Sequence, residues 1–324
     1  MELTRKNFLM ASALGLAGCR TNGLALGGGS FPTDFAYGPK QGQLRLNVRG
    51  LREQVRLCVL SDTHLALHDE RDDAYAGHYA RMAQYGGSPE AFTARLATAR
   101  KDGADAVLLL GDVISFPTRK NVEFVRGELD RSGVNWIYVA GNHDWHFEGV
   151  PGGDVEQRDR WLPDRLASLF RDGDDPLCFS RMVKGVRVVA IDNSVYHILP
   201  KQLAFWEGEI AKGDPTILMT HVPLWVEGWS FFTCGCPTWG AATDPYWKIE
   251  RRERWAERQS PEAFAFRESV LRAPNLVAAF SGHIHRLMTA RAGSANLFSA
   301  PGGAKGECLD VTLAPASCSG AEIC

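Results

Sequence analysis

From about residue 42 onward, short apolar runs typical of buried strands alternate with amphipathic stretches typical of helices. The apolar runs are 54–60, 105–110 and 135–140, and the helical stretches between them are 88–101 and 118–131. Ser88, Pro89 and Glu90 supply an N-cap, a proline in the first turn and an early acidic residue for the first helix. This order and spacing predict right-handed crossovers and a largely parallel sheet.

The second half continues the strand pattern without an internal repeat. Further strands are expected at 186–191, 216–219, 276–280, 287–292, 296–299 and 308–313. The chain has 324 residues, of which 45% are hydrophobic and 23% are charged, so it can bury a sizeable core. The 36 Lys and Arg residues nearly balance 38 Asp and Glu residues, so no nucleic-acid partner held by bulk charge is expected. We therefore expect one α/β domain over 42–324.

The N-terminal 18 residues predict a signal peptide. Arg5 and Lys6 precede an apolar run over 8–17, which is too short to span a bilayer as a stable helix. Residues 4–9 resemble a twin-arginine export signal in which Lys6 replaces the second arginine. The chain is therefore expected on the periplasmic or cell-surface side of a membrane.

A lipid anchor is expected directly after this segment. Leu16-Ala17-Gly18-Cys19 resembles a bacterial lipobox, which would make Cys19 the lipidated first residue of the mature protein. The glycine-rich residues up to 41 would then form a tether. The alternative is an incidental cysteine near a simple cleavage site.

Among the other cysteines, Cys58 lies within an apolar strand pattern and is expected to be a buried thiol.

Polar side chains suited to metal binding follow each predicted strand. They are Asp62 and His64, Asp112, Asn142 and His143, His221, and His283 and His285. Ligands in open α/β folds bind beyond the carboxyl ends of the strands. This oxygen and nitrogen set without thiolates suits Mn, Fe, Zn or similar ions, and it exceeds what one metal needs. Each motif alone is weak evidence, but their joint occurrence in order predicts two metals that share a carboxylate.

The ordered motifs closely resemble those of the calcineurin-like metallophosphoesterase superfamily. They are Asp62-x-His64, Gly111-Asp112, Gly141-Asn142-His143-Asp144, His221 and Gly282-His283-x-His285, spanning residues 62–285. The resemblance implies a four-layer α/β/β/α sandwich, in which two mixed sheets pack face to face between outer helices. It also implies a dinuclear metal centre on loops at the sheet edge, and hydrolysis of a phosphomonoester or phosphodiester.

The resemblance also implies a role for each motif residue. Asp62, His64 and His285 would bind one metal, Asn142, His221 and His283 the other, and Asp112 would bridge both. A hydroxide bridging the metals would attack phosphorus in line. His143 would stabilise the phosphoryl group or protonate the leaving oxygen, with Asp144 orienting its imidazole. Residues 113–116 supply no tyrosine, so the purple acid phosphatase subclass is not expected.

An aromatic-rich insertion is expected over about 223–258, and it contains five of the nine tryptophans. It could form a wall for the leaving group or an insertion with its own small core. A base-stacking wall would favour a nucleotide or cyclic-nucleotide phosphodiesterase. The alternative of a different class is a surface lipoprotein that binds metals without turnover.

The segment 65–87 is expected to be a solvated loop.

Overall fold

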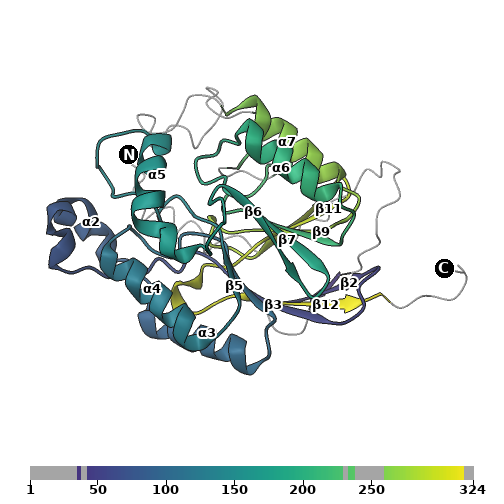
Figure 1. The fold of residues 1–324 in the computed structure, drawn as a ribbon, viewed down its shortest axis with the longest axis horizontal. Helices are drawn as coiled ribbons and strands as arrows, with labels where there is room; N and C mark the ends of the chain where they lie inside the picture. The colour runs from purple at the N-terminus through teal and green to yellow at the C-terminus, as the bar shows by residue number, and fades with distance from the viewer. Residues whose placement is uncertain (1–34, 38–41, 229–232, 238–258, 317–324) are drawn as a thin grey trace, which may run out of the picture.

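Two six-stranded sheets lie between two layers of helices in the computed structural model (Figure 1). The structure describes residues 35–37, 42–228, 233–237 and 259–316. Helices α3 (Pro89–Lys101) and α4 (Arg119–Ser132) cover one sheet, and α6 (Pro200–Ile210) and α7 (Pro261–Arg272) cover the other. The four-layer sandwich with two mixed sheets is therefore confirmed.

The first sheet holds the strands that begin the domain and the strand that ends it. Its order is β1 (Phe35–Tyr37), β2 (Gln43–Val48), β12 (Leu309–Pro315), β3 (Val55–Leu60), β4 (Ala106–Leu109) and β5 (Trp136–Tyr138). Strands β3, β4 and β5 are parallel, whereas β12 pairs antiparallel with β3 and parallel with β2. Every residue of β4 is buried, as expected for a strand covered on both faces.

The second sheet comes from the later half of the chain. Its order is β10 (Met288–Ala292), β11 (Ala295–Ser299), β9 (Leu276–Ser281), β8 (Thr216–Met219), β7 (Val186–Ile191) and β6 (Cys178–Val183). Strands β7, β8 and β9 are parallel, so their carboxyl ends meet at one edge. Strands β6 and β10 run antiparallel to their neighbours. The crossover pattern predicted a largely parallel sheet, whereas both sheets are mixed, with antiparallel strands at the edges of the second and an antiparallel β3–β12 pair inside the first.

The N-cap signal read from the sequence is confirmed at the first helix, and both helices of the first crossovers are present. The Ser88 hydroxyl accepts a hydrogen bond from the Ala91 amide at the start of α3. Helix α4 ends at Ser132 and is capped by Gly133, whose φ of 62° is the left-handed conformation that glycine tolerates. The expected strands are all present within a few residues of the predicted bounds.

The segment 65–87 is not a loop, contrary to expectation. It contains a 3₁₀ helix, η1 (Glu70–Tyr75), followed by α2 (Ala76–Ala83). Asp72 is buried there and pairs with Arg165 at 2.8 Å, while Tyr79 stacks on Phe116. These contacts are made to distant parts of the chain, so the local sequence pattern did not reveal them.

The remaining helices are shorter and connect the two sheets. They are α5 (Asp154–Trp161), the π-helical turn η2 (Leu162–Leu166), and the 3₁₀ turns η3 (Ala167–Leu169) and η4 (Gly303–Lys305). The predicted signal peptide, Cys19 and most of the aromatic-rich insertion lie outside the described residues. Within the described part of the chain, no helix has both the length and the apolar character needed to cross a membrane.

Candidate metal centre

The loops that follow β3 and β4 are joined by backbone hydrogen bonds at the end of the first sheet. The Asp62 amide donates to the Gly111 carbonyl at 3.0 Å, and the His64 amide donates to the Asp112 carbonyl at 2.9 Å. The loop after β9 joins them from the second sheet, because the His283 amide donates to both carboxylate oxygens of Asp62. Strand ends of both sheets therefore meet at one place.

The predicted ligands fall into two groups. In the first, the Nε2 atom of His285 lies 3.3 Å from Asp62 Oδ1 and 3.1 Å from His64 Nε2. In the second, Asp112, His221 and His283 place their ligating atoms within 4.8 Å of one another. The Asn142 side-chain oxygen lies 3.1 Å from His221 Nε2, which adds Asn142 to this group.

Asp112 lies between the two groups. Its Oδ2 atom is 3.8 Å from His64 Nε2 and 3.3 Å from His221 Nε2. A carboxylate within reach of both groups has the position that a bridging ligand requires. The structure thus brings together the residues singled out as ligands, with the same division into two sets.

The backbone at these ligands is held in a conformation that most side chains avoid. Within the described ranges, seven non-glycine residues have a positive φ. Five of them are predicted ligands: Asp62 (53°), His64 (48°), Asp112 (49°), His283 (70°) and His285 (52°). Such strained residues are typical of functional sites, where surrounding contacts hold them in place.

The motif glycines are needed because the loops pass very close to one another. A Cβ atom on Gly282 would lie 1.7 Å from Ser61 Oγ, and one on Gly141 would lie 2.3 Å from Asp112 Oδ1. Both distances are far below van der Waals contact. Any side chain at these positions would push the ligand-bearing loops apart.

A family model supplies the decisive comparison. The model for calcineurin-like phosphoesterases matches residues 55–287, which is well over half of the chain. This chain belongs to that family. It is therefore a metal-dependent phosphoesterase, a hydrolase that acts on phosphoric esters.

Several solved structures resemble the phosphoesterase at low sequence identity. A dimetal phosphatase from Danio rerio is 14% identical, with a TM-score of 0.49 over 81% of this chain and 93% of that one. A purple acid phosphatase from yellow lupin is 13% identical, with a TM-score of 0.49 over 86% of this chain and 48% of that one. A phosphopantetheinyl hydrolase from Mycobacterium tuberculosis is 14% identical, with a TM-score of 0.39 over 77% of this chain and 90% of that one. A comparison with curated protein sequences gave no significant match.

The electrostatics of the ion-free protein fit two cations. Burial opposes ionisation of Asp62, but the charge and hydrogen bond of His285 hold the Asp62 pKa well below its usual range. Burial likewise opposes ionisation of Asp112, and His221 lowers the Asp112 pKa. In the reverse direction, burial would lower the pKa of His221, but Asp112 raises it to about 9. In each group an ionised carboxylate is therefore stabilised by a nearby protonated histidine. A bound metal ion would supply that positive charge instead.

The other two histidines are ready to act as ligands. Burial lowers the pKa of His64 to about 4 and that of His283 to about 3, so both rings are neutral near pH 7. A neutral imidazole is the form that coordinates a metal. The separations of 3.1–4.0 Å among Asp62, His64 and His285 suit ligands around an ion at about 2.0–2.2 Å. The donor set therefore fits a dinuclear metal site.

His143 lies against the first group. Its ring packs edge-on against the His64 ring with centroids 4.9 Å apart, and its amide donates to Asp112 Oδ1 at 2.7 Å. The ligating atoms of His64, Asp112 and His143 also lie within 4.8 Å of one another. His143 is buried, with 7% of its surface exposed, so its imidazole lies inside the site beside the ligands.

The contacts of Asp144 join two loops of the site. Its carboxylate oxygens accept hydrogen bonds from the Ile114 amide at 2.9 Å and the Gly141 amide at 2.7 Å. Burial, with a smaller contribution from the charge of Asp112, raises the pKa of Asp144 to about 7 in the ion-free protein. These bonds hold the loops after β4 and β5 together. The orientation of the His143 ring by Asp144 stays a prediction.

Two residues that support the ligands were missed in the sequence. The Tyr196 hydroxyl lies 2.7 Å from His283 Nε2, and Tyr196 itself has a φ of 62°. The Asn193 side chain donates to the Val222 carbonyl at 2.7 Å and accepts from the Val222 amide at 2.9 Å, which fixes the loop of His221. The polar run Asp192-Asn193-Ser194 directly after β7 was the available signal for a further strand end at the site.

Proposed function

We propose that this phosphoesterase hydrolyses phosphomonoesters or phosphodiesters by in-line displacement at a dinuclear centre. The observation that carries the proposal is the position of Asp112, whose Oδ2 atom reaches toward a histidine of each ligand group. When bound, two divalent or trivalent ions such as Mn, Fe or Zn supply neutralising charge for the phosphoryl oxygens and acidify water. Asp62, His64 and His285 would hold one ion, and Asn142, His221 and His283 the other, with Asp112 shared.

Two further side chains have separate roles: His143 acts on the substrate, and Tyr196 positions a metal ligand. His143 lies beside the ligands without being needed to complete either group. We assign His143 one of two roles. It donates a proton to the leaving oxygen as the ester bond breaks, or it donates a hydrogen bond to the phosphoryl group. Tyr196 holds His283 by its second ring nitrogen, and this outer contact fixes the direction in which the ligand points.

Hydrolysis of two synthetic esters tests the proposal. The full-length chain reconstituted with Mn²⁺ is expected to hydrolyse p-nitrophenyl phosphate or bis-p-nitrophenyl phosphate, and Asp112→Asn is expected to abolish turnover. The ratio of the two rates separates a monoesterase from a diesterase. A metal-loaded protein inactive on both esters would contradict the proposal as tested and favour a metal-containing binding module.

A nucleotide substrate has less support. Trp225 is the described tryptophan of the aromatic-rich insertion, and the Arg267 guanidinium lies 4.8 Å from the centre of its ring. Arg267 also donates to the Trp225 carbonyl at 2.6 Å, so one ring face is occupied from within the protein. Hydrolysis of cyclic and linear nucleotides measured beside the synthetic esters would separate this alternative.

We further propose that the enzyme is exported and anchored by a lipid on Cys19. The support is the basic and apolar N-terminal segment followed by the sequence Leu16-Ala17-Gly18-Cys19. Mass spectrometry of the N-terminal peptide is expected to show a diacylglyceryl group on Cys19. A Cys19→Ala chain that partitions into detergent as the wild-type protein does would contradict the anchor.

A further inference from the structure

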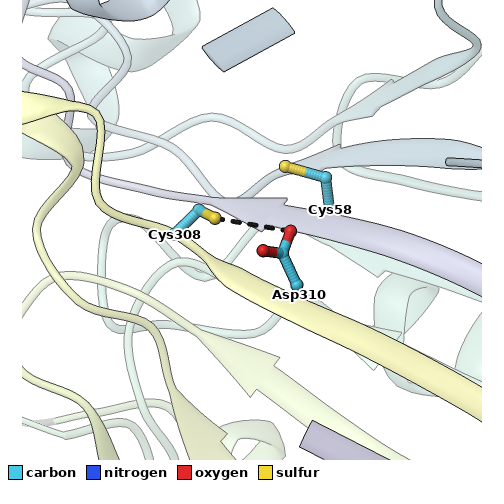
Figure 2. Close-up of side chains that lie close together, drawn as sticks. All are labelled: Cys58, Cys308 and Asp310. Atoms are coloured by element: carbon cyan, nitrogen blue, oxygen red, sulfur yellow. Dashed lines mark hydrogen bonds between the residues drawn. The ribbon is translucent and has the colours of Figure 1, made fainter. Parts of the chain in front are cut away.

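A second group of ligating side chains lies on the first sheet, away from the catalytic loops. It consists of Cys58 in β3, Cys308 directly before β12, and Asp310 in β12, here called the cysteine cluster. The two sulfurs and a carboxylate oxygen lie within 4.8 Å of one another, and Cys308 Sγ is 3.6 Å from Asp310 Oδ1. Figure 2 shows the three side chains converging from the two strands. Asp62 follows four residues after Cys58, beyond the end of β3.

The strand register produces this convergence. Asp310 pairs directly with Cys58 across the antiparallel β3–β12 ladder, and Leu309 pairs with Val59. Because side chains alternate along a strand, Cys308, Asp310 and Cys58 share one face of the sheet. Cys308 is one diagonal step from Cys58, and both are free cysteines whose sulfurs lie within 4.8 Å of each other. Two sulfurs at that separation can both reach a single ion at about 2.3 Å.

The chemistry of the cysteine cluster favours a cation that binds sulfur. Both cysteines are buried, Cys58 with 1% and Cys308 with 9% of its surface exposed. Two thiolates and a carboxylate carry three negative charges. The Arg95 guanidinium adds one positive charge, since its Nε donates to Cys58 Sγ at 3.4 Å and its Nη2 donates to Asp310. A divalent ion would bring the group to neutrality after the two S–H protons leave to solvent.

Access to the cysteine cluster supports the same interpretation. A cavity of about 460 Å³ opens beside Cys58, Arg95 and Asp310, so an ion or a water ligand can reach the site.

We propose that Cys58, Cys308 and Asp310 bind one thiophilic divalent cation of the Zn²⁺ class, with a fourth position open to the cavity. Two cysteines and one carboxylate around a single ion are a ligand set that Zn²⁺ accepts. The ion would join β3, the strand that leads to Asp62, to β12, the last strand along the chain. This site is separate from the dinuclear centre and does not depend on the proposed reaction.

Co²⁺ is the probe for this site, because sulfur ligands give Co²⁺ a near-ultraviolet charge-transfer absorption that oxygen and nitrogen ligands do not. Reduced full-length protein already loaded with Mn²⁺ is titrated with Co²⁺. We expect the absorption to saturate at about one ion per chain and to be bleached by Zn²⁺. The ligands assigned to the catalytic centre contain no sulfur, so the absorption cannot come from that centre, and the variants below assign it among the cysteines.

Matched variants locate the signal. Cys58→Ser and Cys308→Ser are expected to lose the absorption, and Asp310→Asn to weaken Co²⁺ binding by about tenfold or more. Cys308 lies outside the strand, so its variant is the safer one for folding, which the thermal midpoint checks. Cys178→Ser is the control, since Cys178 is also buried beside a carboxylate, 4.0 Å from Asp175, and should keep the full signal.

Three results would overturn the proposal. The first is the absence of the absorption in the reduced wild-type protein. The second is its persistence in a folded Cys308→Ser variant. The third is a Cys58–Cys308 disulfide-linked peptide recovered from protein that had been saturated with Zn²⁺, which would show a covalent link in place of a metal site.

Discussion

Strand β3 leads to the catalytic ligands at its end and carries part of the cysteine cluster in its middle, and the two groups are assembled in opposite ways. The catalytic ligands come from loops of both sheets, and Asp62 and His64 have positive φ values of 53° and 48°. The cysteine cluster comes from two paired strands, and none of its three residues is among the described residues with positive φ.

The comparison shows that backbone strain is found at the catalytic loops and not at the cysteine cluster. Neighbours in a ladder are brought together by the register itself, at no extra cost to the backbone. Loops that converge from two sheets need left-handed residues and glycines at their closest approaches, such as Gly282. Changes at the catalytic loops should therefore have larger consequences than changes elsewhere in the fold.

The largest effect is expected for Asp112→Asn. The substitution removes the one carboxylate that reaches both ligand groups, so both ions and turnover should be lost together. We expect kcat/KM to fall by about 10³-fold or more, equivalent to about 4 kcal/mol. Metal analysis and ester hydrolysis measured on the same sample check this. Asp130→Asn, which changes an exposed carboxylate paired with Arg126, is the control and should retain both properties.

His143→Ala should separate metal binding from chemistry. The two ions should remain, while turnover falls by about 10²–10⁴-fold on an ester with a poor leaving group. The loss should be smaller with p-nitrophenyl phosphate, whose leaving group needs little help from an acid. Wild-type turnover on the poor leaving group would refute the assignment of His143 as the acid.

Gly282→Ala should disturb the catalytic loops through a single methyl group. The added Cβ would lie 1.7 Å from Ser61 Oγ and 2.7 Å from Asp62 Oδ2, so we expect a loss of about 1–3 kcal/mol in the free energy of unfolding. Gly208→Ala in α6 is the matched control, because nothing lies within 4 Å of its Cβ. That variant should be slightly stabilised, by about 0.4–1 kcal/mol. Equal denaturation midpoints for the two variants would contradict the close approach.

Tyr196→Phe should have the smallest effect of this set. It keeps the ring but removes the hydroxyl 2.7 Å from His283 Nε2. We expect the affinity for the more weakly held ion to fall by about 10–100-fold, and kcat at saturating metal to change less. Calorimetric titration of the ion-free protein measures both ions. Unchanged affinity for both would show that Tyr196 does not position His283.

The sequence predicted the elements whose signals are local. The cap at Ser88 and the run of buried residues in β4 were recognised because one stretch of chain determines them. The helices η1 and α2 were missed because long-range contacts hold them, such as the Asp72–Arg165 pair. Antiparallel β6 and the return of β12 to the first sheet depend on pairings that periodicity does not report.

The same division holds at the site. The ligands could be recognised because metal-binding residue types recur after successive strands in the order of a known family. Tyr196 could not, since its part in the site depends on a left-handed turn that brings its hydroxyl to His283. The cysteine cluster was likewise missed, because its residues lie 250 positions apart and meet only through the ladder register.

Electron paramagnetic resonance of the Mn²⁺-loaded protein tests the central claim most directly, since it reports whether two ions share a ligand. The account predicts an exchange-coupled signal from a pair of Mn²⁺ ions in the wild-type protein, absent in Asp112→Asn and retained in His143→Ala. A spectrum of isolated Mn²⁺ at every loading of the wild-type protein would contradict the shared carboxylate and with it the dinuclear centre.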